Sequence, residues 1–415
     1  MPRLPNGLEP SPEPIDRPLV TPPPPAPATL PTGSLGDVRV DGVAIVYRLF
    51  DVGFEIDLPR AADLLASSAP SRVRPLRGEA QAIQIANPPV AVILGTEAVR
   101  VPGATGDAEV SARVFDFGGV SLRISIHAAP GMAWNEFSAF GNAVDAGIDL
   151  SPVFERHLNA LLERIAPAIT RPAIAPITED YVVFRINAVR GADGTIARDG
   201  AMGTGGALSP ATWGDEDLVP LLLNERRPLS AIARHELLPH RFSYYTDDLT
   251  ILTWDNALVV EPSPGDTDVQ YILEFANAQL LELRVYDAVL DAELPAMYDR
   301  VASARPRRQL ALLQRRFAGL LSDLQALVAD STELVERVES ALKVTDDVYL
   351  ARIYTAALDI FRGREWRAGI DRKLAIIRET YAMLNDESQA ARAEALEVLI
   401  VALIAAELVL PFFLR

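Results

Sequence analysis

The pattern of the chain changes at DVQYILEFANAQLLELRVYDAVLDAEL, residues 268–294. It opens on an aspartate suited to a helix cap and continues without glycine or proline until Pro295. Before Pro264 the chain has short apolar runs broken by turn residues, whereas afterwards apolar residues recur at helical spacing. The sequence therefore predicts an α+β domain over 37–264 and a helical, coiled-coil domain over 265–395.

Upstream of that stretch, alternating apolar runs predict strands, most of them paired as hairpins. Hairpins are predicted at 109–129 and 249–262, a strand pair or one long strand at 38–49, a strand at 180–189, and helices at 150–167 and 214–225. Strands grouped in hairpins, with helices between the groups, favour an α+β fold over a doubly wound sheet.

Downstream, two stretches carry apolar residues at alternating steps of four and three, the spacing of a coiled-coil seam. The first lies within 306–343 and the second within 370–398. Two matched seams predict an antiparallel helical hairpin, formed within one chain or completed by another subunit.

The second seam leads without a helix breaker into the apolar run LEVLIVALIAAELVLPFFL, residues 396–414. As a helix, the 17 residues from 398 to 414 would span about 26 Å, close to the minimum for crossing a bilayer. We predict a C-terminal transmembrane helix, with Glu397 at its boundary and Glu407 facing a partner helix or protonated. The alternative is a buried helix in a soluble oligomer.

Composition narrows the classes of function. The formal net charge is −17, so phosphate backbones would repel the chain and no nucleic-acid partner is expected. There is no cysteine, which excludes disulfides, thiolate metal sites and cysteine nucleophiles. Residues 1–36 hold 12 of the 32 prolines, and we predict a disordered, partly polyproline II arm. A chain rich in arginine and without a transit peptide indicates a bacterial protein.

Two motifs partly match known catalytic or phosphate-binding sequences. RHELLPH (234–240) places His235 and His240 five residues apart with Pro239 between them, which does not fit the zinc-protease helix. GAMGTGG (200–206) lacks the Lys-Ser/Thr of a phosphate-binding loop. We therefore expect no catalytic residue, metal ligand or cofactor, and enzymatic activity is the less favoured reading.

A binding pocket between the α+β domain and the helix 268–294 is the competing hypothesis. Polar residues placed there are Asp247, Asp248, Glu274, Asn277, Gln279, Glu282 and Arg284. Glu274, Asn277 and Arg284 share one helical face and form the candidate polar face. The alternative is that this face binds no ligand and is either solvated or hydrogen-bonded between the two domains.

Several segments carry a family resemblance. They are DDLTILTWDNALVVEP (247–262), LEFANAQLLELRVYDAVLDAEL (273–294), VYLARIYTAALDIF (348–361), RKLAIIRETYAMLN (372–385) and LEVLIVALIAAELVL (396–410). Over about 240–415 the chain resembles the YagE-type "required for meiotic nuclear division" family of uncharacterised membrane proteins. The resemblance implies an α+β domain, a helical hairpin and one C-terminal transmembrane helix, with membrane attachment and homo-oligomers but no reaction.

The leading hypothesis is a non-enzymatic, tail-anchored scaffold. The lipid bilayer and further copies of the chain would be its partners, with other protein partners possible in addition. Its acidic α+β body would lie in the cytoplasm, attached by a single-pass C-terminal anchor, and its coiled-coil helices would join the copies. An enzyme or ligand-binding module with the pocket described above is the second hypothesis.

Overall fold

The computed structural model describes residues 35–68, 87–191, 209–225, 227–262, 267–304 and 347–413, together with positions 322, 325, 326 and 329. Three of the features predicted above lie outside these residues, wholly or for the most part. They are the proline-rich arm, the glycine-rich motif at 200–206 and the seam within 306–343.

The first half of the chain builds a mixed sheet of nine strands in the order β3-β4-β5-β1-β8-β11-β10-β9, with β6 paired to β1. The strands are β1 (Arg39–Asp51), β3 (Val90–Glu97), β4 (Ala108–Val114), β5 (Gly119–His127), β6 (Met132–Ala133), β8 (Thr178–Arg190), β9 (His240–Phe242), β10 (Leu249–Leu252) and β11 (Asn256–Val260). All neighbours are antiparallel except β8 and β11, which are parallel. Strands β2 (Gly53–Ile56) and β7 (Ile169–Pro172) form a second, two-stranded sheet.

Both predicted hairpins are present. Strands β4 and β5 pair around the turn that contains Gly118, whose φ of +100° suits glycine. Strands β10 and β11 pair around residues 253–255. The predicted strands at 38–49 and 180–189 are β1 and β8, which lie side by side in the centre of the sheet.

Each face of the sheet is covered, so the central strands bury side chains on both sides. In β1, Val40 and Ala44 belong to one core, and Val43, Ile45 and Tyr47 belong to the other. This alternation follows from the two-residue period of a strand. The first core is completed by α1 (Leu58–Ser68), α2 (Trp134–Asp145), α3 (Ser151–Ile165) and α4 (Asp215–Leu222). The short helix α5 (Ala231–Leu237) follows α4.

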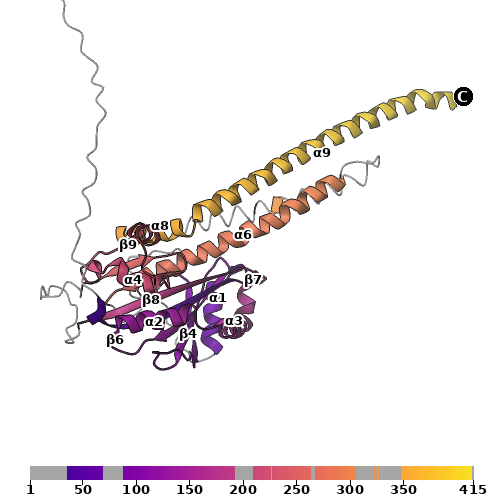
Figure 1. Ribbon diagram of the computed structural model, residues 1–415. Coiled ribbons are helices and arrows are strands. Elements are labelled where there is room, and N and C mark those ends of the chain that lie inside the picture. The colour runs from indigo at the N-terminus through magenta and orange to yellow at the C-terminus, as the bar shows by residue number, and fades with distance from the viewer. Residues whose placement is uncertain are drawn as a thin grey trace, which may run out of the picture. The chain divides into compact units, whose positions relative to one another are not determined.

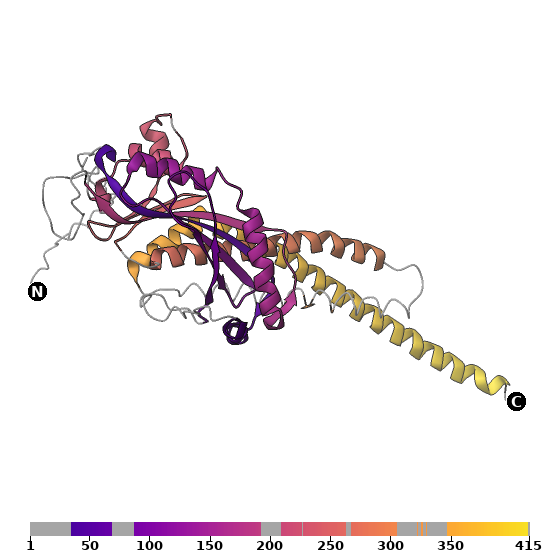
Figure 2. The ribbon, with the colours of Figure 1, turned by 90° about the horizontal axis from the view of Figure 1, so that it is seen from below.

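The second face of the sheet is covered by the C-terminal helices α6 (Asp268–Ala304) and α8 (Val348–Ile360), as Figure 1 shows. The last helix, α9 (Gly363–Phe413), runs beside α6 in both views (Figures 1 and 2). A third core joins these two helices and contains Leu283, Leu290, Met297, Ile370, Leu374, Ile377 and Leu384. The predicted seam within 370–398 thus packs, in its first half, on α6.

Two helix boundaries differ from the prediction. Helix α6 does not stop at Pro295 but continues to Ala304, because the packing of Met297 into the third core offsets the hydrogen bond that proline removes. Helix α3 covers Ser151–Ile165 instead of the predicted 150–167, and Leu150 is its N-cap. The Ser151 hydroxyl instead accepts a hydrogen bond from Arg48, at 2.9 Å.

The predicted fold class is wrong in its last element. Within the described part of the chain, no helix combines the length and the hydropathy needed to cross a membrane. The 18 residues that end at Ala405, where the description of side chains stops, include Arg392, Glu394 and Glu397. Each charge at the centre of a bilayer would cost about 3 kcal/mol. The transmembrane helix at 396–414, and the single-pass membrane localisation inferred from it, are corrected accordingly.

Candidate functional site

Helix α6 carries five buried polar side chains, of which Gln279 faces α8 and accepts a hydrogen bond from the Tyr354 hydroxyl. Gln270, Glu274, Asn277, Gln279 and Glu282 are each at most 3 % exposed. Glutamate is rarely buried to this extent without a partner, because desolvation of a charge is costly. The partners of these five side chains therefore decide whether they form a site or a structural interface.

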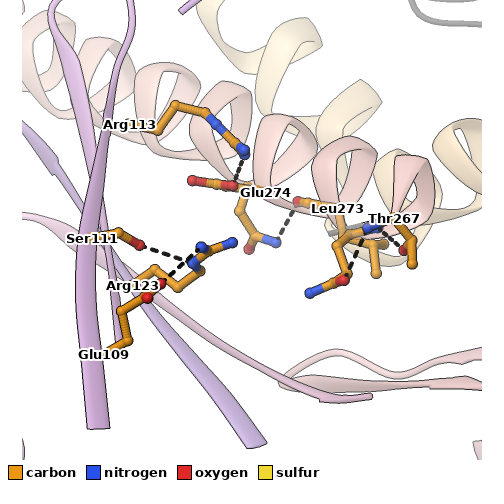
Figure 3. A network of polar contacts seen from close by, with 9 residues as sticks. Glu109, Ser111, Arg113, Arg123, Thr267, Leu273 and Glu274 are labelled. Carbon is orange, nitrogen blue, oxygen red and sulfur yellow. Dashed lines mark hydrogen bonds and ion pairs between the residues drawn. The ribbon is translucent and has the colours of Figure 1, made fainter. Parts of the chain in front are cut away.

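Glu274 is paired with a cation from the sheet. Arg113 of β4, itself 6 % exposed, donates from Nη1 to Oε2 of Glu274, as Figure 3 shows. The Arg113 guanidinium also lies over the Tyr271 ring, 4.6 Å from its centroid. Because both charges are enclosed and satisfy each other, the pair holds α6 in register on the sheet and presents no free carboxylate to a ligand.

The other members of the predicted face are also occupied. Asn277 donates from Nδ2 to the carbonyl of Leu273 at 2.9 Å. Arg284 donates to the carboxylate of Glu179 in β8. The side chains of the candidate polar face, Glu274, Asn277 and Arg284, therefore bond to three separate partners and do not converge on one cavity.

A pocket does lie beside this face, at the start of α6. It has a volume of about 460 Å³ and is formed where the first residues of α6 and α8 meet β10, β11 and the β9–β10 connection. Its lining residues are Tyr244, Tyr245, Asp247, Asp248, Thr250, Val260, Glu261, Pro262, Asp268, Val269, Asp347, Tyr349 and Leu350. Asp247 and Asp248 belong to the predicted set, whereas Glu261, Asp268 and Asp347 were not predicted to line a pocket.

The pocket is strongly acidic. Five of its lining residues are aspartate or glutamate, and none of those thirteen is lysine, arginine or histidine. Burial raises the pKa of Glu261, and the charges of Asp268 and Asp248 add to that increase. Burial likewise raises the pKa of Asp268, helped by the charge of Asp347. Like charges in a partly desolvated cavity favour a bound cation.

Part of this acidity has a structural role. Asp347 is the N-cap of α8, and its Oδ1 accepts hydrogen bonds from the backbone amides of Tyr349 and Leu350 at 2.8 and 3.1 Å. Asp248 accepts from the amide of Tyr244 at 2.8 Å. The Asp347 cap could be read from the sequence, but its position in the pocket could not.

Aromatic rings complete the pocket. Tyr244 and Tyr245 are 68 % and 62 % exposed and meet edge to face with centroids 4.8 Å apart. Tyr349 is half-buried, and burial raises the pKa of its hydroxyl to about 12, so it remains a neutral hydrogen-bond donor. Carboxylates beside tyrosine rings are the groups that recognise an ammonium or a guanidinium.

The described residues include no cluster of three or more histidine, aspartate or glutamate side chains at metal-binding spacing. His235 lies in α5 and His240 in β9, so the two histidines of RHELLPH belong to different elements. The pocket lining also contains no histidine, cysteine or serine. Its geometry suits binding.

A second surface feature lies at the far end of α9. Leu396, Ile400, Val401, Leu403 and Ile404 are each between 53 % and 60 % exposed. Figures 1 and 2 show α9 continuing past the end of α6. Glu397 lies within this part of α9 with an exposed side chain, and Glu407 follows in the same helix. We refer to residues 396–404 as the apolar α9 segment.

Comparison with known proteins identifies the family of the first half of the chain. Residues 41–267 match the family model described as "Uncharacterized protein MJ0711, N-terminal domain", which is more than half of the chain. The chain belongs to this family. The uncharacterized protein MJ0711 of Methanocaldococcus jannaschii is 28 % identical over 193 residues, which are 46 % of this chain and 58 % of that protein. The chain thus covers a little over half the length of this curated relative. No solved structure matches this chain.

The family match corrects the resemblance to the YagE-type family. The MJ0711 N-terminal domain family covers the sheet, whereas the supposed resemblance depended mainly on helices after residue 268. Leucine-rich helical stripes and apolar helices recur in unrelated proteins because few residue types pack well between helices. Such segments are weak markers of a family.

Proposed function

We propose that the protein is a non-enzymatic scaffold whose copies assemble through the apolar α9 segment. One observation carries this proposal: five large apolar side chains on one stretch of helix are more than half exposed, although the same helix is packed against α6 nearer its start. Contiguous apolar surface of this kind marks interaction sites in soluble proteins.

The spacing of the exposed residues favours another helix as the covering partner. Leu396, Ile400 and Leu403 follow steps of four and three, as do Ile370, Leu374 and Ile377, which pack on α6. Steps of this kind give a stripe that fits against a second helix. A second copy of α9 supplies a helix with the same stripe, so a two-fold contact would be self-complementary.

Cysteine cross-linking tests this proposal directly. The chain contains no cysteine, so one introduced cysteine reports on one position. Ile400→Cys should give covalent dimers on mild oxidation. Glu379→Cys, an exposed position in the part of α9 beside α6, serves as the matched control and should give few. Equal yields from the two variants, or no dimer from Ile400→Cys, would contradict the proposal.

The acidic pocket supports a second candidate function, the binding of an organic cation. The observation that favours it is the composition of the lining, which contains five carboxylates and three tyrosines but no lysine, arginine or histidine. An arginine or lysine side chain of a partner, or a free polyamine, has the required charge and shape.

Calorimetric titration with spermidine and with N-acetyl-arginine amide tests the second candidate. Asp247→Asn combined with Asp248→Asn should weaken binding at least about tenfold, because two carboxylates are lost at the cavity. Asp371→Asn, an exposed acid on α9, should leave binding unchanged. Equal weakening by both variants would indicate nonspecific attraction to an acidic surface.

A further inference from the structure

One polar side chain on α6 lacks a partner. Glu282 is 1 % exposed, and no described residue forms a hydrogen bond to its Oε1. It lies on a helix packed into the core that contains Phe115, Phe117 and Phe275. Buried polar atoms are nearly always hydrogen-bonded, and an isolated buried carboxylate is far more costly than a neutral one. Glu282 therefore needs a bound positive species, and a proton is the smallest.

Two further carboxyls, those of Asp51 and Asp116, lie at one corner of the sheet, where Asp51 pairs with Gly119 just after the β4–β5 turn. Asp51 ends β1, and Asp116 belongs to the turn between β4 and β5. Backbone hydrogen bonds join these two segments: the amide of Val52 donates to the carbonyl of Gly118 at 3.0 Å, and the amide of Ile56 donates to that of Asp116 at 2.9 Å. The negative charges of both Asp51 and Asp116 act on Glu282.

Asp116 and Asp51 each accept a hydrogen bond from a neutral group. Asp116 accepts from Nδ2 of Asn87 at 2.7 Å, and Asp51 accepts from the amide of Gly53 at 3.2 Å. Neither bond supplies a positive charge. Asp51 and Asp116 therefore cannot neutralise Glu282, and their own charges oppose its ionisation.

Several charged groups on the other elements packed against α6 have partners among the described residues. These pairs are Arg113 with Glu274, Arg284 with Glu179, Arg48 with Asp180, Arg123 with Glu109, Lys373 with Asp287 and Asp291, and Arg364 with Asp359. Arg185 of β8 bonds to Gln270, and Arg352 of α8 lies over the Phe242 ring. Among these described groups, none offers Glu282 a counter-charge.

We propose that Asp51, Asp116 and Glu282 form a proton-binding latch, in which a proton on Glu282 holds the middle of α6 against this corner of the sheet. Loss of the proton gives Glu282 a buried negative charge that is repelled by those of Asp51 and Asp116, and this loosens the contact. The proposal concerns a conformational control of α6 and does not depend on the assembly of α9 or on the acidic pocket.

The direction of the pH effect follows from linkage. Burial, and then the charges of Asp51 and Asp116, raise the pKa of Glu282 well above its ordinary value of 4.5. Burial raises the pKa of Asp51 to about 6. Because the folded state holds these protons more tightly than the unfolded state, their contribution is complete below the ordinary values and is lost as the pH rises through the raised ones.

Hydrogen–deuterium exchange of the whole chain tests the latch. After correction for the intrinsic exchange rate, amides of 278–286 and of the β4–β5 turn should open more often as the pH rises from 5 to 8. One linked proton gives up to tenfold per pH unit. Glu282→Gln should reduce this dependence to the part contributed by Asp51, whereas Asp299→Asn, at an exposed position on the same helix, should keep it in full. Wild-type protection that does not change with pH would overturn the proposal, and so would the same dependence in Glu282→Gln.

If Glu282→Gln fails to fold, carboxyl carbon NMR of the wild-type protein decides. A Glu282 resonance in the neutral position at pH 5.5 supports the latch. A resonance in the ionised position at that pH would overturn it, because no proton would then be held.

Discussion

The buried pair of Arg113 and Glu274 gives the sharpest prediction for stability. Replacement of Glu274 by methionine keeps the volume of the side chain but leaves the Arg113 cation enclosed and unpaired. Both side chains are buried to more than nine-tenths, so water cannot replace the lost carboxylate. The contact of Arg113 with the Tyr271 ring exists before and after the change and does not compensate.

Removal of one partner from a buried ion pair costs about 3–5 kcal/mol. We therefore expect Glu274→Met to lower the free energy of unfolding by about that amount. Replacement of both partners, Arg113→Met with Glu274→Met, should recover most of the loss, because an apolar pair of similar volume carries no desolvation penalty.

The assay is urea unfolding followed by tryptophan fluorescence, with the free energy from linear extrapolation. Glu109→Met is the matched control: Glu109 lies on the same strand as Arg113, is 44 % exposed in its side chain and stands 3.9 Å from Arg123. An exposed pair contributes at most about 1 kcal/mol. A loss below about 1 kcal/mol for Glu274→Met, or a double variant as unstable as the single one, would refute the reasoning.

Three further predictions concern single positions and are checked by urea or thermal unfolding. Gly118→Ala should cost more than about 2 kcal/mol, because φ is +100° and an added Cβ would collide with the carbonyl of Gly53; an unchanged midpoint would contradict this. Asp347→Ala should cost about 1 kcal/mol through loss of the α8 cap, and Asp347→Asn should recover most of it. Glu261→Gln should gain stability relative to wild type as the pH rises from 5 to 8, because burial raises the pKa of Glu261 and the wild-type contribution falls over that range. A constant difference between the two proteins at all pH values would contradict it.

Local patterns were enough to predict β1, β8 and the two hairpins. Alternating residues around Gly118 predicted the β4–β5 hairpin, whereas the central position of β1 in the sheet could not be read from its apolar run. The helix 268–294 was also predictable, but its continuation to Ala304 depends on packing against α9, which no local pattern reveals.

The site was only partly predictable, because its contacts join distant segments. Spacing on one helical face grouped Glu274 with Asn277, and both side chains are buried. The partner of Glu274 is Arg113, 161 residues away, and nothing in either segment identifies the other. The acidic pocket likewise joins Asp247 to Asp347, whose proximity arises only because α6 and α8 begin at the same place.

The tail shows how far composition alone can mislead. A run of apolar residues predicted a membrane anchor, yet the described part of α9 brings charged residues close to that run. What remains on the surface is a short apolar segment with helical spacing, for which a second helix is the proposed cover.

The central claim, that copies assemble through the apolar α9 segment, is tested most directly by sedimentation equilibrium of the whole chain. The wild-type protein should have a mass of at least two chains, each of 45.0 kDa. The variant Leu396→Gln/Ile400→Gln/Leu403→Gln should sediment as a monomer with an unchanged circular dichroism spectrum. A monomeric wild type, or a variant that assembles as strongly as the wild type, would contradict the account.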